Sequence, residues 1–340
     1  MGLYTSLIRP LLFTLPPERA QKLAETALRA RPVWRALRPF FSVEDPRLQT
    51  DMAGIHLPGP VGLAAGYDKD CRLIPSLSNL GFGYIVGGTV VAQPREGNPR
   101  PRLARNSEEG SLVNSLGFPS HGLDAVVHTL GGRAYHRVPL VLSISGLSVE
   151  EFVRCSRAIQ PLATGLELNI SSPNTQGIRV FQEPSMLQEL LVALAPFKEK
   201  PLFLKLPPYF DDDQRAQVLK LVDLGLQHGV DGVTASNTRP VGDGRLAVGR
   251  GGLSGNPLFP HMLRIVKDIR HHAGPGLVIN ACGGISSGQD ALQALRAGAD
   301  TVQLFTGFIY QGPALMKQIN RYILRFMEME SIPSVADIPR

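Results

Sequence analysis

The stretch Gly165-Leu-Glu-Leu-Asn-Ile-Ser-Ser-Pro-Asn-Thr-Gln-Gly177 joins a short apolar run to a loop of amide and hydroxyl side chains. Short runs of this kind, bounded by turn residues, are typical of buried strands. Polar chemistry that begins where a strand ends indicates a site at the edge of a sheet. From its neighbours alone, Ser172 is open to three roles: nucleophile, base or turn residue.

The same succession of apolar strand, polar turn and helical stretch occurs eight times beyond residue 60. The predicted strands are Val61–Ala65, Tyr84–Val90, Pro139–Ser145, Gly165–Ser171, Pro201–Leu206, Gly232–Asn237, Gly276–Ala281 and Thr301–Phe305. The predicted helices between them include Ser148–Gln160, Ser185–Phe197, Asp211–His228, Leu258–His272 and Ser287–Ala297. Eight alternations predict a (β/α)8 TIM barrel. The rival, a doubly wound sheet, is disfavoured because its usual glycine fingerprint is missing from Gly62-Leu-Ala-Ala-Gly-Tyr-Asp-Lys69.

The composition is that of an ordinary globular protein, with 340 residues, 43% hydrophobic and 19% charged. The mean hydropathy is near zero, which excludes an integral membrane bundle. Cys71, Cys155 and Cys282 lie far apart, without a CxxC or a His/Cys spacing. We therefore predict neither a disulfide framework nor a metal site, and a reducing compartment.

The formal charge of +6 is concentrated at the N-terminus, where residues 1–40 hold seven Arg or Lys and two Glu. We expect two amphipathic helices there, one over about Leu3–Leu15 and one that begins after Pro16-Pro17. A basic polar face, an apolar opposite face and the single Trp34 are typical of helices that lie in a bilayer interface. A helical cap on the barrel is the alternative. The segment has neither the pattern of a signal peptide nor a membrane-spanning run, and nothing in the chain indicates a nucleic-acid partner. We predict a helical segment at 1–45 and a barrel domain at 46–340.

Catalytic groups in such barrels come from the carboxyl ends of the strands. In this chain those ends carry amides, hydroxyls and two lysines, without carboxylate pairs or histidines, which disfavours glycosidase, metal-hydrolase and Ser-His-Asp chemistry. Glycines at Gly251–Gly255, Gly283-Gly284 and Thr306-Gly307, with a helix expected to begin near Ser286, favour a phosphorylated cofactor or substrate. Lys205 inside a barrel needs an anion or a ring oxygen. A phosphate-bearing flavin meets both requirements.

A series of ordered motifs points to one family. They are the helices from Tyr4 to Ala27, Ala64-Ala-Gly-Tyr-Asp-Lys69, Glu96-Gly-Asn-Pro-Arg-Pro-Arg102, Val113-Asn-Ser-Leu-Gly-Phe118, Ser120-His-Gly122, the loop Asn169–Gly177, Ser236-Asn-Thr238, Gly251–Gly255, Gly284-Ile-Ser-Ser-Gly-Gln-Asp290 and Val302-Gln-Leu-Phe-Thr306. With these motifs the chain resembles, over nearly its whole length, the class 2 dihydroorotate dehydrogenases, which are membrane-associated and quinone-linked.

The resemblance implies FMN-dependent oxidation of (S)-dihydroorotate to orotate in de novo pyrimidine biosynthesis, with a quinone as electron acceptor. Ser172 would remove the proton from C5 while C6 passes hydride to the flavin, with a bound water or a threonine relay assisting Ser172. The implied substrate-binding residues are Lys69, Asn114, Asn169, Asn174, Asn237 and Thr238. The implied FMN-binding residues are Ala65, Gly66, Thr89, Ser143, Lys205, Ser236, Gly255, Gly283, Gly284, Phe305 and Thr306. Arg105 would lie near a quinone tunnel between the N-terminal helices.

The resemblance also implies a peripheral protein on the cytoplasmic side of a bacterial inner membrane, because the chain starts at the amphipathic helix without a transit segment. Several positions depart from the family pattern, among them Ser143, which replaces an asparagine before a shortened loop, and Phe305, which replaces a tyrosine. These changes leave two alternatives, a diverged flavoprotein with another substrate and a non-catalytic paralogue. We interpret His121, a lone loop histidine, as structural.

Overall fold

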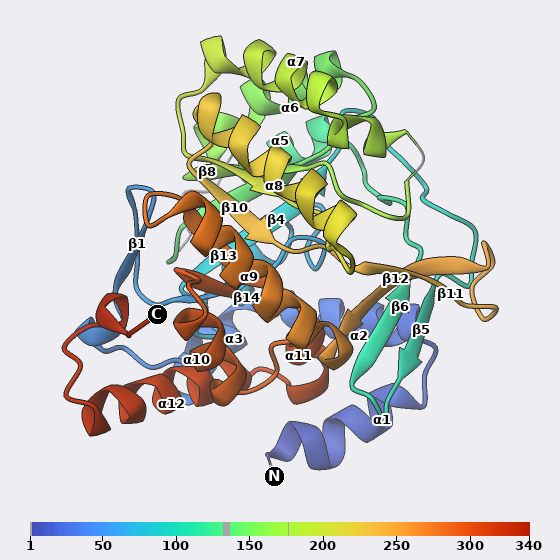
Figure 1. Ribbon diagram of the computed structural model, residues 1–340. Helices are drawn as coiled ribbons and strands as arrows, with labels where there is room; N and C mark the ends of the chain where they lie inside the picture. Colours follow the sequence, from blue (N-terminus) through green and yellow to red (C-terminus); the bar gives the residue numbers. More distant parts are fainter. Residues whose placement is uncertain (1, 132–136, 176) are drawn as a thin grey trace.

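The computed structural model describes residues 2–131, 137–175 and 177–340. At its centre, eight parallel strands close into a barrel in the order β10-β13-β14-β3-β4-β7-β8-β9 (Figure 1). These strands are β3 (Val61–Leu63), β4 (Tyr84–Val90), β7 (Leu140–Ile144), β8 (Gly165–Asn169), β9 (Leu202–Lys205), β10 (Gly232–Ala235), β13 (Val278–Cys282) and β14 (Thr301–Leu304). All eight predicted strands are therefore confirmed, and so is the (β/α)8 TIM barrel.

Helices surround the barrel, and the five predicted ones begin and end within three residues of the observed limits. The helices that follow the barrel strands are α4 (Ile74–Leu77), α5 (Leu123–Leu130), α6 (Val149–Ile159), α7 (Pro184–Leu194), α8 (Asp212–Gln227), α9 (Phe259–Ala273), α10 (Gly288–Arg296), α11 (Thr306–Gln311) and α12 (Leu315–Met329). Side-chain caps explain three of the starts. Ser148, Asp211 and Ser287 each accept the backbone N–H three residues on, which satisfies a donor that the first turn leaves free.

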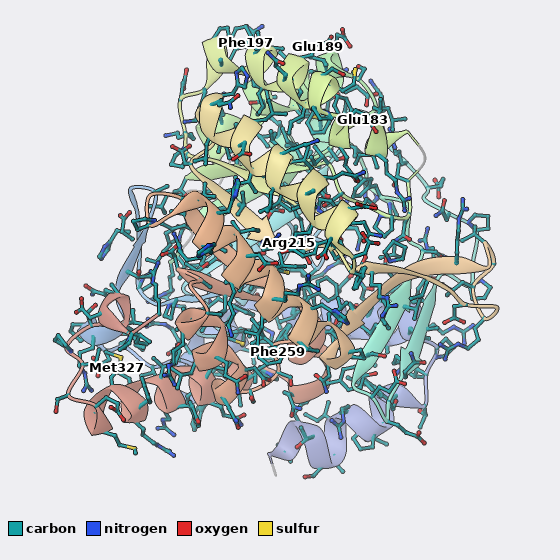
Figure 2. The ribbon with its side chains drawn as sticks, in the orientation of Figure 1. Glu183, Glu189, Phe197, Arg215, Phe259 and Met327 are labelled. Carbon is teal, nitrogen blue, oxygen red and sulfur yellow. The ribbon has the colours of Figure 1, made fainter. Side chains whose placement is uncertain are left out.

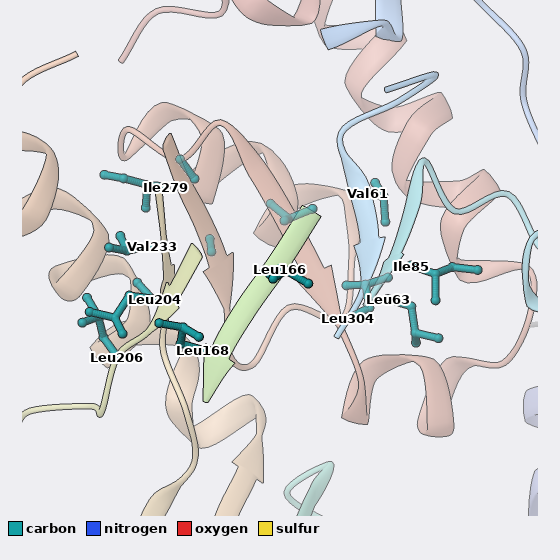
Figure 3. Close-up of a cluster of buried hydrophobic side chains, with 14 of the residues drawn as sticks. Val61, Leu63, Ile85, Leu166, Leu168, Leu204, Leu206, Val233, Ile279 and Leu304 are labelled. Atoms are coloured by element: carbon teal, nitrogen blue, oxygen red, sulfur yellow. The ribbon is translucent and has the colours of Figure 1, made fainter. Parts of the chain in front are cut away.

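Alternation along each strand divides its side chains between two environments. In β8, Leu166 and Leu168 point away from the barrel axis and join the apolar layer beneath the helices (Figure 3), whereas Glu167 and Asn169 point inward. Polar contacts tie the surrounding helices to one another. Arg215 of α8 donates from Nε to Asp268 of α9 at 2.9 Å (Figure 2).

A two-stranded hairpin closes the amino-terminal end of the barrel. Its strands are β1 (Thr50–Met52) and β2 (Ile55–Leu57), and Met52 and Leu57 pack with Tyr84 and Phe203 from inside the barrel. The carboxyl-terminal mouth is thus left for the site.

A four-stranded antiparallel sheet stands beside this mouth, in the order β11-β12-β6-β5, and the sequence did not predict it. Its strands are β5 (Leu103–Asn106), β6 (Ser111–Asn114), β11 (Arg239–Gly242) and β12 (Arg250–Gly255). The interpretation of Gly251–Gly255 as a loop of free backbone donors is therefore wrong, because β12 pairs with both of its neighbours. Its glycines serve close packing instead: a Cβ on Gly252 would lie 2.1 Å from Thr238 Oγ1.

The N-terminal segment forms one more helix than was predicted. A π-helical turn, η1 (Tyr4–Ile8), continues into α1 (Arg9–Phe13), and α2 (Pro17–Leu28) and α3 (Arg31–Phe41) follow. Tyr4 Oη donates to Ile309 O at 2.6 Å and Arg9 Nη1 to Tyr310 O at 3.0 Å, so the segment is docked on α11. None of the helices in the described ranges has the length and apolarity needed to cross a bilayer. Short 3-10 turns complete the chain: η2 (Pro46–Leu48), η3 (Gln160–Leu162), η4 (Ile178–Gln182), η5 (Ala195–Phe197), η6 (Asn256–Leu258) and η7 (Val335–Asp337).

Candidate functional site

A cavity of about 580 Å³ begins at the mouth of the barrel and continues between the N-terminal helices. Apolar side chains of those helices, among them Leu12, Phe13 and Leu23, line its outer part. The predicted site residues that line it are Ala65, Gly66, Lys69, Thr89, Arg105, Asn114, Asn169, Ser172, Asn174, Lys205, Ser236, Asn237, Thr238, Gly255, Gly283, Gly284, Phe305 and Thr306. Ser143 is the exception, because it is fully buried behind the cavity wall.

Hydrogen bonds between amides and hydroxyls order the inner wall of the cavity. Asn169 Nδ2 donates to Thr89 Oγ1 at 3.0 Å, and Ser143 Oγ lies 3.1 Å from the same Thr89 oxygen. Asn237 Nδ2 reaches Asn169 Oδ1 at 3.3 Å and Ser171 Oγ at 3.0 Å. Strands β4, β7 and β8 and the segments after β8 and β10 thereby contribute to one network, in which the Ser143 side chain bonds to Thr89.

Ser172 lies in the loop after β8 and is 7% exposed. Its Oγ accepts the N–H of Asn174 at 3.4 Å, and Asn174 Nδ2 donates to Asn114 Oδ1 at 2.8 Å. The buried hydroxyl of Thr175 has no hydrogen-bond partner within the described residues. This leaves Ser172 at the cavity wall beside two amides. Gln176 of the same loop lies outside the described residues.

Lys205 is held inside the barrel by Glu167, a residue that the sequence did not single out. Lys205 Nζ lies 3.7 Å from Glu167 Oε1, while Thr234 Oγ1 donates to Glu167 Oε2 at 2.8 Å. Burial acts to lower the pKa of Lys205, but the interactions with Glu167 and Cys282 together outweigh it, and the pKa is raised. Lys205 therefore keeps its positive charge at the cavity wall.

The loop after β3 brings a second lysine to the cavity. Lys69 Nζ donates to Gly66 O at 2.7 Å, and burial lowers the pKa of its ammonium group. Asp68 stabilises this loop by accepting the N–H groups of Arg72 at 2.9 Å and Leu73 at 2.7 Å. Burial raises the pKa of Asp68 to about 6 despite these two bonds.

The N-terminus of helix α10, which was predicted to face an anion, is not among the residues that line the cavity, and side chains of the chain cap part of it. Ser287 Oγ accepts the N–H of Asp290, and Asp290 accepts the N–H of Ser286. The helix that begins at the cavity is α11, whose Thr306 hydroxyl donates to Ser254 Oγ at 2.9 Å.

Several glycines that line the cavity have left-handed backbone, and two of them also approach other backbone closely. Gly255 and Gly284 have φ of +99° and +76°. A Cβ on Gly284 would lie 2.5 Å from the backbone N of Phe259, at the start of α9 (Figure 2). A side chain at either position would be strained and would crowd the backbone behind it.

Arg105 joins the barrel side of the cavity to the N-terminal helices. Its Nη2 hydrogen-bonds Leu15 O, and its guanidinium carbon lies 4.5 Å from the centre of the Phe13 ring. Partial burial lowers the pKa of this arginine. Its Nη1 is buried without a hydrogen-bond partner in the described part of the chain.

Further polar residues line the cavity and were not predicted, among them Ser254, Cys282 and Gln303. Gln303 lies two residues after the inward-facing Thr301, and Cys282 lies two residues after the inward-facing Asn280. Because side chains alternate along a strand, this spacing could have predicted that both residues face the inside of the barrel. Burial raises the pKa of the Cys282 thiol.

His121 lies outside the cavity lining, and its Nδ1 is 2.7 Å from Asp70 Oδ2. In the described ranges, no three His, Cys, Asp or Glu side chains gather as metal ligands would.

Comparisons with known proteins agree with this geometry. The family model for dihydroorotate dehydrogenase matches residues 47–327. A relative from Roseiflexus sp. (strain RS-1), named dihydroorotate dehydrogenase (quinone), is 37% identical, with 98% of this chain and 96% of the relative covered. A relative of the same name from Mycobacterium marinum is also 37% identical, with 94% of this chain and 92% of the relative covered.

A solved structure of similar fold is the DHODH of Eimeria tenella in complex with ferulenol. It superimposes with a TM-score of 0.82 at 27% identity, and the match covers 97% of this chain and 98% of that one. Sequence and structure lead to the same assignment, and the chain belongs to the dihydroorotate dehydrogenase family.

Proposed function

We propose that this chain oxidises (S)-dihydroorotate to orotate with FMN as its cofactor and a membrane quinone as electron acceptor, in de novo pyrimidine biosynthesis. One observation carries the proposal: a single cavity joins Ser172 and its neighbouring asparagines to an apolar channel between the N-terminal helices. A polar chamber suits a charged pyrimidine, and an apolar channel suits a quinone. The members of this family are flavin-dependent, which leaves FMN as the cofactor to be tested.

The residues present fit FMN. Gly255 and Gly284 bring bare backbone to the cavity wall, and the hydroxyl-bearing residues Ser254 and Thr306 line the same wall, which together suit a phosphate. Lys205 places a positive charge where the ring system would lie. The residues proposed to hold FMN are Ala65, Gly66, Thr89, Lys205, Ser236, Gly255, Gly283, Gly284, Phe305 and Thr306, with Ser143 acting through Thr89.

Ser172 is proposed as the base that takes the proton from C5 of the substrate. A serine hydroxyl is a weak base, so it needs a neighbour that stabilises the transferred proton. The hydroxyl of Thr175, three residues on in the same loop, is proposed as this neighbour, because it has no hydrogen-bond partner within the described residues. Lys69 would meet the substrate carboxylate, and Asn114, Asn169, Asn174, Asn237 and Thr238 would hold the ring. When bound, FMN would supply the hydride acceptor for C6.

The N-terminal segment is proposed to rest on the cytoplasmic face of a bacterial inner membrane and to admit the quinone past Arg105. Among the described residues, seven of the fourteen exposed large apolar side chains lie in the first 40 positions. They are Leu3, Leu7, Ile8, Leu11, Leu23, Val33 and Phe40. Exposed apolar side chains on a basic amphipathic segment support binding to an anionic lipid surface.

The test is anaerobic mixing of the purified, FMN-loaded protein with dihydroorotate, followed by flavin absorbance. We expect the absorbance to bleach in the native protein. In Ser172→Ala the bound FMN should remain, while the rate of bleaching falls by about 10²–10⁴-fold, the usual contribution of a general base. A yellow protein that dihydroorotate does not bleach would refute the proposed activity, and an unchanged rate in Ser172→Ala would reject Ser172 as the base.

A further inference from the structure

A buried arginine links the N-terminal helices to the substrate side of the cavity. Arg102 precedes β5, and its side chain is 8% exposed. Its Nε donates to Glu18 Oε1 of α2 at 2.7 Å. Its Nη1 donates to two backbone oxygens, Glu96 O at 2.7 Å and Asn98 O at 3.2 Å. The guanidinium therefore fixes the loop 96–98 relative to α2.

Glu18 is the carboxylate that balances the charge of Arg102 within the described chain. Glu18 itself is more exposed, at 28%, and also meets the exposed Arg100 at 3.0 Å. A buried guanidinium without a counter-charge is unfavourable, and it would move toward solvent and abandon its other acceptors. The position of Arg102 thus depends on α2 being docked.

Asn98 carries the linkage onward to two loops of the site. Its Nδ2 donates to Ser115 O at 2.9 Å and to Asn174 O at 3.1 Å, and its backbone N–H donates to Leu116 O at 2.9 Å. The amide is closely packed, since a Cβ on Gly117 would lie 2.8 Å from its Cγ. Asn98 therefore holds the segment after Asn114 and the loop of Ser172 in one position.

The last step reaches the reacting groups. Asn174 donates from its side chain to Asn114 and from its backbone to Ser172 Oγ. A continuous series of hydrogen bonds thus runs from Glu18 through Arg102, Asn98 and Asn174 to Ser172. Each member is bonded to the next at 3.4 Å or less.

We infer that Glu18 is a positioning residue for the dihydroorotate side of the site, so that docking of helix α2 sets the affinity for dihydroorotate. This inference rests on the proposed function. Helix α2 lines the apolar channel proposed for the quinone, and the inference gives it a second role in the oxidation of dihydroorotate, a half-reaction that does not involve the quinone. Linkage is reciprocal, so bound dihydroorotate also holds α2 in place.

The experiment compares Glu18→Ala with Lys22→Ala. Lys22 lies on the same helix, is exposed and does not line the cavity. Anaerobic FMN reduction is measured against dihydroorotate concentration without quinone. In Glu18→Ala we expect the dissociation constant of dihydroorotate to rise about tenfold, a usual size for coupling between sites, with a much smaller change in the limiting rate. Lys22→Ala should match the native protein.

A double-mutant cycle tests the route. If the effect passes through Asn98, then Glu18→Ala combined with Asn98→Ala is no weaker in dihydroorotate binding than Asn98→Ala alone. If the double variant instead shows the product of the two single-variant increases in the dissociation constant, the route through Asn98 is rejected. An unchanged dissociation constant in Glu18→Ala would reject the inference as a whole.

Hydrogen exchange gives a readout that does not depend on the activity. Peptides that cover residues 114–120 and 170–175 should exchange faster in Glu18→Ala than in Lys22→Ala, because their backbone oxygens lose the hydrogen bonds from Asn98. Equal exchange in both variants would overturn the inference. If dihydroorotate fails to bleach even the native protein, the proposed function is refuted, and hydrogen exchange alone decides whether Glu18 positions these loops.

Discussion

Replacing Lys205 by methionine removes the positive charge inside the barrel and leaves the Glu167 carboxylate without its partner. Lys205 and Glu167 side chains are 7% and 1% exposed, with their charged atoms 3.7 Å apart. The second carboxylate oxygen of Glu167 accepts only from Thr234 among the described residues. Methionine keeps most of the lysine's volume, so the principal change is a buried carboxylate that has lost its cation.

The expected cost follows from this burial. Removing one partner of a buried ion pair destabilises a protein by about 3–5 kcal/mol, because the other charge remains uncompensated. The entropy of unfolding is about 2.1 cal/mol/K per residue, or roughly 0.7 kcal/mol/K for 340 residues. Lys205→Met should therefore lower the melting temperature by about 4–7 °C.

The assay is thermal unfolding of the FMN-free proteins at pH 7 and at one heating rate. The raised pKa of Lys205 keeps the native pair charged at this pH, since the contribution of a raised lysine is lost only as pH rises through its folded-state pKa. The matched control is Lys205→Met with Glu167→Gln, which removes both charges and should recover most of the loss. The reasoning would be refuted if the melting temperature of the single variant were lower by less than about 1 °C. It would also be refuted if the double variant were as unstable as the single variant.

Two further outcomes follow from individual contacts. Asp68 has a folded-state pKa of about 6, above the usual carboxyl value, so its stabilising contribution is complete below about pH 4 and is lost as pH rises through 6. Urea titration measures the free energy of unfolding of the native protein and of Asp68→Asn. The difference between the two proteins should change by about 1 kcal/mol in favour of the native protein when the pH falls from 7 to 5. A difference that does not change with pH would contradict this prediction. Ser143→Ala removes one hydrogen bond from Thr89 and should weaken FMN binding about fivefold, as titration of the FMN-free protein can measure; a loss of about a hundredfold would mean that Ser143 contacts FMN itself.

The barrel could be predicted because its strands repeat a simple pattern. Leu166 and Leu168 pack under the helices, while Asn169 ends its strand at the mouth. The antiparallel sheet could not be predicted in the same way. Gly251 and Gly252 have the composition of a loop, and they form a strand only because distant segments pack against their bare backbone.

Much of the site was predictable from topology, since residues at the ends of parallel barrel strands must converge. Glu167 was missed because one acidic residue inside an apolar run shows no partner in the sequence. Its partner, Lys205, comes from the next strand, 38 positions later. Ser143 was placed in the wall by resemblance, but its short side chain ends at Thr89 rather than in the cavity.

The contacts that dock the N-terminal helices have a consequence for biosynthesis. The bonds from Tyr4 to Ile309 and from Arg9 to Tyr310 join residues 305 and 301 positions apart. The ribosome releases this segment first, long before it makes α11, so its apolar side chains have no barrel to dock on during translation. Closing so long a loop is also the entropically costly step, which places docking of the segment late in folding. The part of the chain that is made first is thus completed last.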